Sequence, residues 1–274
     1  DPRDLHSFPT RRSSDLCSKQ PQSGKSGTVT FIYTGNVGQK IEPCGCRIPK
    51  GGLPRHANVM RSLKEQFPEA ITVDSGALIF ESVRLTPPFE PVLRAKARLT
   101  ADEFKTSGVD AVNVSPMDLA DSVDSLLVFG GEGFPWISSN IAWKKDGSLV
   151  FTPDVTKKAG ELTVGIFGLI DSNTLGVPYF DDASPMTVLD PKETARKEVA
   201  KLRQTADIVL ALAYMDLPQI EKLIAEVPGI DMVVMSHTRS HNPASEHMHF
   251  MPLKSGKTLI ARCPDGGTDR KSVV

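Results

Sequence analysis

The chain contains few cysteines, few aromatic residues and no long apolar run. Only 4 of its 274 residues are cysteine, which is too few for a disulfide-stapled scaffold. No apolar stretch approaches the roughly 20 residues that a helix needs to cross a bilayer. Its 32 Lys and Arg are balanced by 33 Asp and Glu, so no basic surplus favours nucleic acid. We therefore expect a globular domain with a sizeable core and no nucleic-acid partner.

Both ends of the chain match the translation of a sequencing adapter. The stretch HSFPTRRSSDL back-translates into a common short-read adapter, and DRKSVV into part of its reverse complement. We expect residues 1–16 and 269–274 to be adapter-derived and not native. In this interpretation residues 17–27 are a linker, and residues 28–268 are one domain that is truncated at its C-terminal end.

Cys17 would then open the native segment. The polar stretch that follows it, SKQPQSGKSG, is typical of a flexible linker. This arrangement resembles a bacterial lipoprotein after signal-peptide cleavage, with Cys17 as the lipidated residue. It predicts an exported protein, periplasmic or at the outer membrane, that meets a membrane only through this lipid anchor. The alternative is an ordinary cysteine beside a cut end.

Short β-branched runs alternate with longer amphipathic stretches from residue 28 onward, which predicts an α/β fold with parallel strands. The predicted strands are 28–34, 70–75, 109–115, 135–141, 161–170, 206–214, 229–236 and 257–263, and the predicted helices are 53–67, 91–108, 190–206 and 217–227. The DG pair in WKKDGSLVFTPD indicates a hairpin. Loops that leave the carboxyl ends of parallel strands form the functional crevice, and here they begin TGNVG, DSGA, SPMD, AYMD and SHTR.

The order of these loops resembles the 5'-nucleotidase branch of the calcineurin-like metallophosphoesterases. The matching segments include TGNVGQKIEP, VDSGALIF, GVDAVNVSPMDL, ADIVLALAYMDL and PGIDMVVMSHT. The resemblance implies a two-sheet β-sandwich flanked by helices (αββα). It also implies a secreted bacterial hydrolase that holds two metal ions on these loops.

Most positions that would hold the metals in this family carry side chains that cannot ligate them. As the resemblance assigns them, these positions are Asn36, Gly38, Gly76-Ala77, Ser115-Pro116-Met117-Asp118, Tyr214, His237 and Arg239. Ala77 stands where the family has the carboxylate that bridges both metals, and a two-metal mechanism needs both ions. We therefore expect no intact dinuclear site. Asp74, which precedes the Gly pair, is expected to hold its loop by hydrogen bonds.

Four histidines, at positions 237, 241, 247 and 249, lie close together in the sequence. Their spacing can gather imidazoles around a metal. A rebuilt site would hold one divalent ion through Asn36, Asp118 and His237, and His241 is a further candidate ligand. In a binding module without turnover, Arg239 beside His237 could contact phosphate. The alternative is a polar loop of solvated histidines. His56 is expected at the surface or at the end of its helix.

The sharpest departure from the family is Cys44-Gly45-Cys46, directly after Glu42-Pro43. Two cysteines one residue apart can close a small, strained disulfide, which exchanges readily, or bind a soft metal such as Zn or Cu. A branch of the family with an EPCGC loop has members that resemble selenoproteins, which implies thiol chemistry at Cys44 or Cys46. The alternative is a solvent-side loop with incidental cysteines. Cys263 is expected to be a small buried hydrophobe, or else to face the crevice.

Three functions therefore compete. The first is a phosphoesterase descendant with a Cys-based redox or soft-metal role that acts on a small molecule or a thiol partner. The second is a metal-dependent phosphoester or nucleotide hydrolase with a rebuilt, single-metal site. The third is a module that binds a nucleotide or a partner without turnover.

Overall fold

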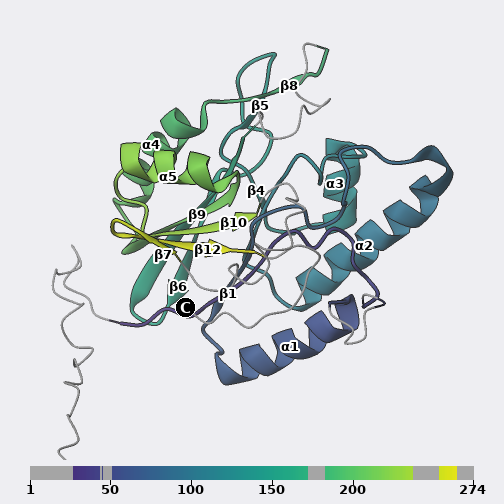
Figure 1. Cartoon of the computed structure of the whole chain (residues 1–274), viewed down its shortest axis with the longest axis horizontal. Helices are drawn as coiled ribbons and strands as arrows, with labels where there is room; N and C mark the ends of the chain where they lie inside the picture. The colour runs from purple at the N-terminus through teal and green to yellow at the C-terminus, as the bar shows by residue number, and fades with distance from the viewer. Residues whose placement is uncertain (1–26, 44, 46–50, 172–182, 237–252, 264–274) are drawn as a thin grey trace, which may run out of the picture.

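The chain folds into two stacked β-sheets with helices on their outer faces (Figure 1). The computed structural model describes residues 27–43, 45, 51–171, 183–236 and 253–263. This αββα arrangement is the predicted fold class.

The first sheet has four parallel strands in the order β1-β2-β3-β4. Its strands are β1 (Phe31–Thr34), β2 (Ile71–Asp74), β3 (Ala111–Asn113) and β4 (Trp136–Ile137). The helical segments between them are α1 (Leu53–Gln66), η1 (Pro87–Phe89), α2 (Glu90–Thr106) and α3 (Val123–Gly130). Parallel strands need such crossovers, so all four strands end at the same edge of the sheet.

The second sheet has the strand order β11-β12-β10-β9-β7-β6. The strands are β6 (Asp154–Ala159), β7 (Leu162–Ile170), β9 (Ile208–Tyr214), β10 (Met232–Ser236), β11 (Leu253–Ser255) and β12 (Thr258–Arg262). The four inner strands are parallel, and the edge strands β6 and β11 are antiparallel to their neighbours. Helices α4 (Pro191–Leu202) and α5 (Leu217–Glu226) cover its outer face.

A small third sheet pairs β5 (Ile141–Trp143) with β8 (Met186–Val188). The predicted turn follows β5. The Trp143 amide donates to the Ser148 carbonyl at 2.9 Å, and Gly147 adopts a φ of 73°. The DG pair therefore forms the predicted turn, because glycine adopts positive φ at little steric cost.

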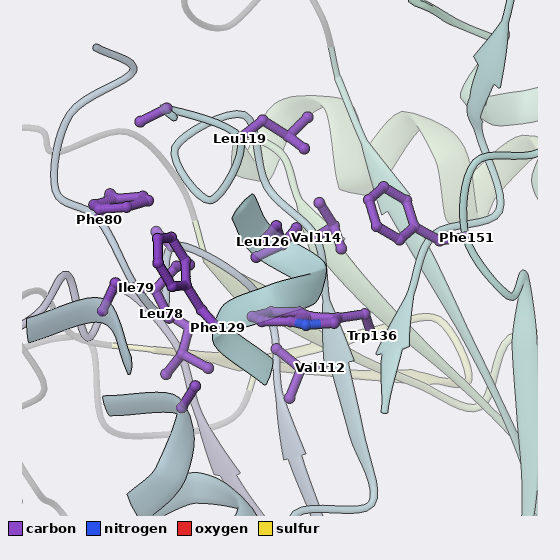
Figure 2. Packing of buried hydrophobic residues seen from close by; sticks show 14 of the residues in the cluster. Leu78, Ile79, Phe80, Val112, Val114, Leu119, Leu126, Phe129, Trp136 and Phe151 are labelled. Carbon is purple, nitrogen blue, oxygen red and sulfur yellow. The ribbon is translucent and has the colours of Figure 1, made fainter. Parts of the chain in front are cut away.

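Strand alternation sorts the core into layers. Side chains such as Val73, Ile166 and Leu210 fill the space between the two sheets, whereas Phe167 and Val233 point outward among the residues of α4 and α5. A further cluster lies beneath α2 and α3, where Leu126, Phe129 and Trp136 pack together (Figure 2). Both faces of each inner strand are therefore buried, which explains why these strands appear in the sequence as continuous apolar runs.

Two sequence expectations differ from the structure on the helical side. His56 is buried between α1 and α2, where its ring stacks on Phe104 with centroids 4.5 Å apart. It was expected at the surface, but its position on α1 places it on the same face as Met60 and Leu63. Val59, on the same helix, is exposed. Helix α3 was not predicted, although Ser122 caps it by accepting from the Ser125 amide at 3.0 Å.

Candidate functional site

The loops after β1 and β2 run side by side at the carboxyl edge of the first sheet. The amides of Asn36, Gly38 and Gln39 donate to the carbonyls of Gly76, Ala77 and Leu78 at 2.9, 2.8 and 3.2 Å. Asn36, Gln39 and Ala77 have φ values of 54°, 62° and 58°, a region that costs a non-glycine residue about 1–3 kcal/mol. These loops carry three of the positions that the family resemblance assigns to the metals, Asn36, Gly38 and Ala77, and main-chain hydrogen bonds join the two loops.

Asp118 fixes the loop that follows β2 by accepting hydrogen bonds from its main chain. Its Oδ1 accepts from the amides of Leu78 and Ile79 at 2.8 and 3.0 Å. Its Oδ2 accepts from the Ala77 amide at 3.0 Å, and from the amide and hydroxyl of Ser115 at 2.9 and 2.7 Å. A carboxylate has about four lone-pair positions, so these five hydrogen bonds leave Asp118 without free acceptor capacity.

Asp74 is a second buried carboxylate at this edge. It accepts from the Thr34 hydroxyl at 2.6 Å and from the Gly76 amide at 2.8 Å, as expected for a residue that holds its loop. Burial raises the pKa of Asp74 to about 7, and the negative charge of Asp118 adds to this shift. Burial also raises the pKa of Asp118, against the opposing effect of its hydrogen-bond donors.

The raised pKa of Asp74 fixes how its contribution to stability depends on pH. The native state holds this proton up to pH of about 7, whereas an unfolded Asp releases it near 3.9. The native state therefore binds more protons than the unfolded state between these two values. Stability from this group is complete below the unfolded pKa and falls as pH rises toward 7.

The second sheet contacts the same edge through Ser236 and Cys263, which both meet Ser75. The Ser236 hydroxyl donates to the Ser75 carbonyl at 2.8 Å, and the Ser75 hydroxyl lies 3.4 Å from the Cys263 sulfur. Cys263 is buried, which raises the pKa of its thiol. This agrees with the expected small buried hydrophobe. Gly35 packs so closely here that a Cβ on it would lie 2.4 Å from Ser75 Oγ and 3.0 Å from Cys263 Sγ.

Tyr214 occupies the space over the loop that follows β2. It is fully buried, and its hydroxyl donates to the Met117 sulfur at 3.6 Å. Its ring lies 3.5 Å from the position that a Cβ on Gly76 would take. Tyr214 and Ala77 belong to one hydrophobic cluster. An apolar contact therefore stands where the family resemblance puts metal ligands.

The described residues do not fit a two-metal centre. Among them, no three His, Cys, Asp or Glu side chains come together as a candidate metal site. Asp118 is saturated by the hydrogen bonds above, and Ala77 and Met117 offer no hard donor. Asn36 is buried. The other predicted site residues lie outside the described residues: Cys17, Cys44, Cys46, His237, Arg239 and His241.

Sequence reasoning missed the hydrogen-bonding role of Asp118, which it considered only as a metal ligand. One signal was present. Ser115 and Asp118 form an S-x-x-D pattern, which is typical of reciprocal side-chain and main-chain hydrogen bonds. The Asp118 amide also donates to the Ser115 carbonyl at 3.1 Å.

The loop that carries the two neighbouring cysteines is closed at its base. The Leu53 amide donates to the Ile41 carbonyl at 2.9 Å. A Cβ on Gly52, whose φ is 92°, would lie 2.8 Å from the Pro43 nitrogen. The chain therefore leaves at Pro43 and returns at Gly51 to nearly the same place. Gly45, between the cysteines, is exposed, and a Cβ on it would have no neighbour within 4 Å.

Comparisons with known proteins identify the fold. The chain is 26% identical over 224 residues to a 2',3'-cyclic-nucleotide 2'-phosphodiesterase/3'-nucleotidase of Yersinia enterocolitica, covering 72% of this chain and 33% of that protein. It is 31% identical over 150 residues to a 5'-nucleotidase of Vibrio vulnificus, covering 48% and 27%. The calcineurin-like phosphoesterase YfkN of Bacillus subtilis superposes with a TM-score of 0.68 at 18% identity, covering 87% of this chain and 82% of that one. No protein-family model matches the sequence.

The chain has the calcineurin-like phosphoesterase fold. Its sequence relatives are nucleotidases and phosphodiesterases, and it spans a third of the Yersinia protein and about a quarter of the Vibrio protein. In the part of the chain that the structure describes, no helix is both long and apolar enough to span a bilayer.

Proposed function

We propose that this chain is a divergent member of the 5'-nucleotidase branch that has replaced two-metal hydrolysis with thiol chemistry at Cys44 and Cys46. The saturated carboxylate of Asp118 carries the first half of this proposal. A group that already accepts five hydrogen bonds has no capacity left to bind a cation. The spacing of the two cysteines carries the second half.

The position of the CGC segment supports exchange with solvent thiols. It follows a base that is fixed by the Leu53 to Ile41 hydrogen bond, and its central Gly45 is exposed. Thiol–disulfide exchange requires an accessible sulfur for in-line attack by a thiolate. A segment anchored at its base and open around Gly45 meets the requirement for access.

The proposed reaction is reduction of a Cys44–Cys46 disulfide by two thiols. A thiolate attacks one sulfur and breaks the S–S bond, which gives a mixed disulfide and one free cysteine thiolate. A second thiolate attacks the mixed disulfide and releases the oxidised partner. Two electrons pass to the protein, and the two protons from the partner thiols end on Cys44 and Cys46.

Export is part of the same proposal. The resemblance to secreted bacterial nucleotidases and the polar segment after Cys17 support a periplasmic or outer-membrane protein with Cys17 as its lipid anchor. An oxidising compartment allows a disulfide to persist, which a strained Cys44–Cys46 pair needs. Mass spectrometry of the protein exported behind a lipoprotein signal peptide tests this directly, because diacylation of Cys17 adds a defined mass that is lost in Cys17→Ser.

The deciding experiment combines thiol titration and elemental analysis on one sample. Two thiols that appear only after reduction, and are absent from Cys44→Ser and Cys46→Ser, support the redox role. Copper or zinc lost with the same substitutions supports a soft-metal role at the same pair. If both cysteines are free, unreactive and metal-free, thiol chemistry at this loop is excluded.

A hydrolase with a rebuilt site is the second candidate, and the nucleotidase relatives favour it. It predicts phosphate release from nucleotides with added Mn²⁺, Zn²⁺ or Mg²⁺ that is lost in His237→Ala and unchanged in Cys44→Ser. The third candidate, a binding module, predicts nucleotide binding without phosphate release under every metal condition.

A further inference from the structure

Exposed apolar side chains gather along α2 and its neighbours. Among the residues that the structure describes, seven large hydrophobic side chains are exposed, and five of them lie on η1, α2 and α3: Phe89, Val92, Leu99, Leu127 and Val128. Figure 1 shows α2 on the outside of the molecule, with α1 and α3 on its flanks. Single apolar residues are normal on a protein surface, whereas a gathered group marks an interaction site.

The outward face of α2 has the pattern of a helix that packs against another helix. Four exposed residues follow each other at spacings of three, four and three: Val92, Ala95, Leu99 and Asp102. This spacing places them on one side of the helix, as in the contact line between paired helices. Ala95 is small, so a second helix can approach closely at this point. The opposite side of α2 is already buried in the core.

Two hollows adjoin this face of α2. One, of about 360 Å³, lies between α2 and Ile41, and the other, of about 450 Å³, reaches Phe129 of α3. Ala95 and Leu99 line both hollows, although half of the Leu99 side chain is exposed. The same surface therefore carries apolar projections and recesses that suit them. Two copies of this surface can fill each other's recesses.

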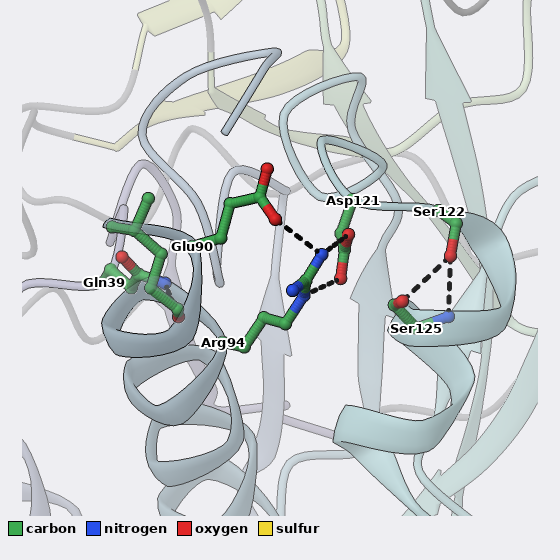
Figure 3. Close-up of polar contacts among 7 residues, drawn as sticks. Gln39, Glu90, Arg94, Asp121, Ser122 and Ser125 are labelled. Atoms are coloured by element: carbon green, nitrogen blue, oxygen red, sulfur yellow. Dashed lines mark hydrogen bonds and ion pairs between the residues drawn. The ribbon is translucent and has the colours of Figure 1, made fainter. Parts of the chain in front are cut away.

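Arg94 fixes α2 relative to α3. Its guanidinium donates to both carboxylate oxygens of Asp121 at 2.8 Å and lies 3.1 Å from Glu90 (Figure 3). Asp121 directly precedes Ser122, the N-cap residue of α3. The two helices are therefore held in place before any contact forms. A surface that is already ordered loses little conformational entropy on association.

The charges beside the two hollows are of both signs. Lys96 and Arg98 are exposed, and so are Glu42 and Asp102. None of these four forms an ion pair with another described residue. A partner with charge of one sign would meet repulsion here, whereas a second copy of the chain brings both signs with it. Mixed charge therefore favours a self-complementary contact with two-fold symmetry.

An antiparallel pair of α2 helices brings opposite charges together. Arg98 precedes Leu99 by one residue, and Asp102 follows Leu99 by three. With a two-fold axis at Leu99, Arg98 therefore lies two residues, or about 3 Å along the helix, from Asp102 of the second copy. Arg98 and Asp102 are four residues apart and lie on the same flank of the contact line. The symmetry keeps them on that flank and creates the pair twice.

The extent of this face sets the strength of the contact. The 17 residues of α2 extend about 26 Å. With the adjoining surface of α3, the strip is about 20 Å wide, so each copy buries on the order of 500 Å². A total of about 1,000 Å² is at the lower limit for a specific interface. We therefore expect a reversible dimer with a Kd in the range of roughly 1–100 µM.

We infer that the outward face of α2 is the interface of a two-fold symmetric dimer, in which α2 of one copy packs antiparallel on α2 of the second around Leu99. The described chain begins at Gly27, on the opposite side of the molecule from α2 (Figure 1), so this dimer leaves that side free. The proposed thiol function neither requires the dimer nor excludes it.

Sedimentation velocity of the full chain across roughly 1–300 µM tests the dimer, because this range brackets the expected Kd. Reductant is present throughout, so that disulfides between chains do not contribute. We expect a monomer at the lowest concentration and a dimer at the highest. Leu99→Glu sets two carboxylates against each other at the axis and should weaken association at least tenfold. Leu189→Glu, at an exposed leucine before α4, is the matched control and should leave the Kd unchanged.

Charge reversal tests the antiparallel arrangement. Arg98→Glu alone and Asp102→Lys alone each set like charges against each other in both symmetric pairs, and each should weaken the dimer roughly fivefold. In an equimolar mixture of the two variants, both pairs of the heterodimer are again between opposite charges. The mixture should therefore recover dimer to within about twofold of the unaltered chain. Lys145→Glu, on the turn after β5, is the charge control and should have no effect.

Several results would overturn the inference. A monomer at every concentration excludes the dimer, and a dimer that persists in Leu99→Glu places the contact elsewhere. Failure of the mixture to recover association excludes the antiparallel arrangement around Leu99. Binding of the monomer to phosphatidylglycerol vesicles that Leu99→Glu abolishes would assign this face to a membrane. Because all of the altered side chains are exposed, the variants should keep the melting temperature of the unaltered chain, and loss of association then reports the contact itself.

Discussion

Replacing Asp118 with Asn tests whether this carboxylate holds the crevice together. The side-chain volume is unchanged, but one of the two acceptor oxygens becomes an NH₂ group. If the remaining oxygen keeps the three donors at Oδ2, the amides of Leu78 and Ile79 lose their acceptor and face a second donor. In the opposite orientation the amide and the hydroxyl of Ser115 lose their acceptor, whereas the Ala77 amide keeps the Ser115 hydroxyl oxygen at 2.9 Å.

In either orientation at least two buried donors are left unpaired. Each costs about 1–3 kcal/mol, so we expect Asp118→Asn to lower the free energy of unfolding by about 2–6 kcal/mol. That is a large part of the 5–15 kcal/mol typical of a folded domain. Equilibrium urea unfolding, followed by tryptophan fluorescence and by circular dichroism, measures the change.

A matched control is Asp124→Asn, in the exposed first turn of α3, where loss of a helix-dipole contact costs at most about 1 kcal/mol. The alternative role for Asp118 is that of a metal ligand. A ligand carboxylate does not stabilise the metal-free protein, so its replacement would leave unfolding unchanged in EDTA. A loss below about 1 kcal/mol in EDTA would refute the structural role.

Three further predictions use residues at the same edge. Because the pKa of Asp74 is raised to about 7, its contribution to the free energy of unfolding should fall by on the order of 4 kcal/mol between pH 4 and 8. Urea unfolding across this range should show a weaker dependence of stability on pH for Asp74→Asn than for the unaltered protein. Parallel pH dependences would contradict the raised pKa. Gly35→Ala should cost about 1–3 kcal/mol through overpacking against Ser75 and Cys263, whereas Gly45→Ala, with open space around it, should leave the melting temperature unchanged. Cys263, buried with a raised thiol pKa, should react with a thiol reagent at pH 8 only after unfolding, and rapid labelling of the native protein would show that it is accessible.

The long apolar runs allowed the strands of the second sheet to be predicted. Residues 161–170 and 206–214 are β-branched or aliphatic almost throughout, and they form β7 and β9 within one or two residues of the predicted ends. Such runs are buried on both faces. Burial between neighbouring strands therefore favours the same extended conformation that the β-branched residues prefer locally. The edge strand β6, with sequence DVTKKA, has a weaker pattern because only one of its faces is covered.

Helix α3 shows why short elements are harder to predict. Its sequence VDSLLVFG is largely apolar, so it shows no clear helical periodicity. Leu126 and Phe129 face the core, while Leu127 and Val128 face solvent. The site is harder still. The Asp118 contacts reach main-chain donors about 40 positions away in sequence, and main-chain donors carry no residue-specific signal.

The proposed function requires loops that keep their shape without metal ions, and the hydrogen bonds of Asp74 and Asp118 provide such support. In a metal-dependent phosphoesterase, ions and loops hold each other in place. Here the loops after β1 and β2 are joined to each other by main-chain hydrogen bonds, and Asp118 fixes the second loop through five more. Protein donors therefore hold both of these described loops at the strand ends. Under the proposed function, Ala77 and Tyr214 are accommodated in the apolar cluster at this edge, and the base of the cysteine loop is fixed by the Leu53 to Ile41 hydrogen bond.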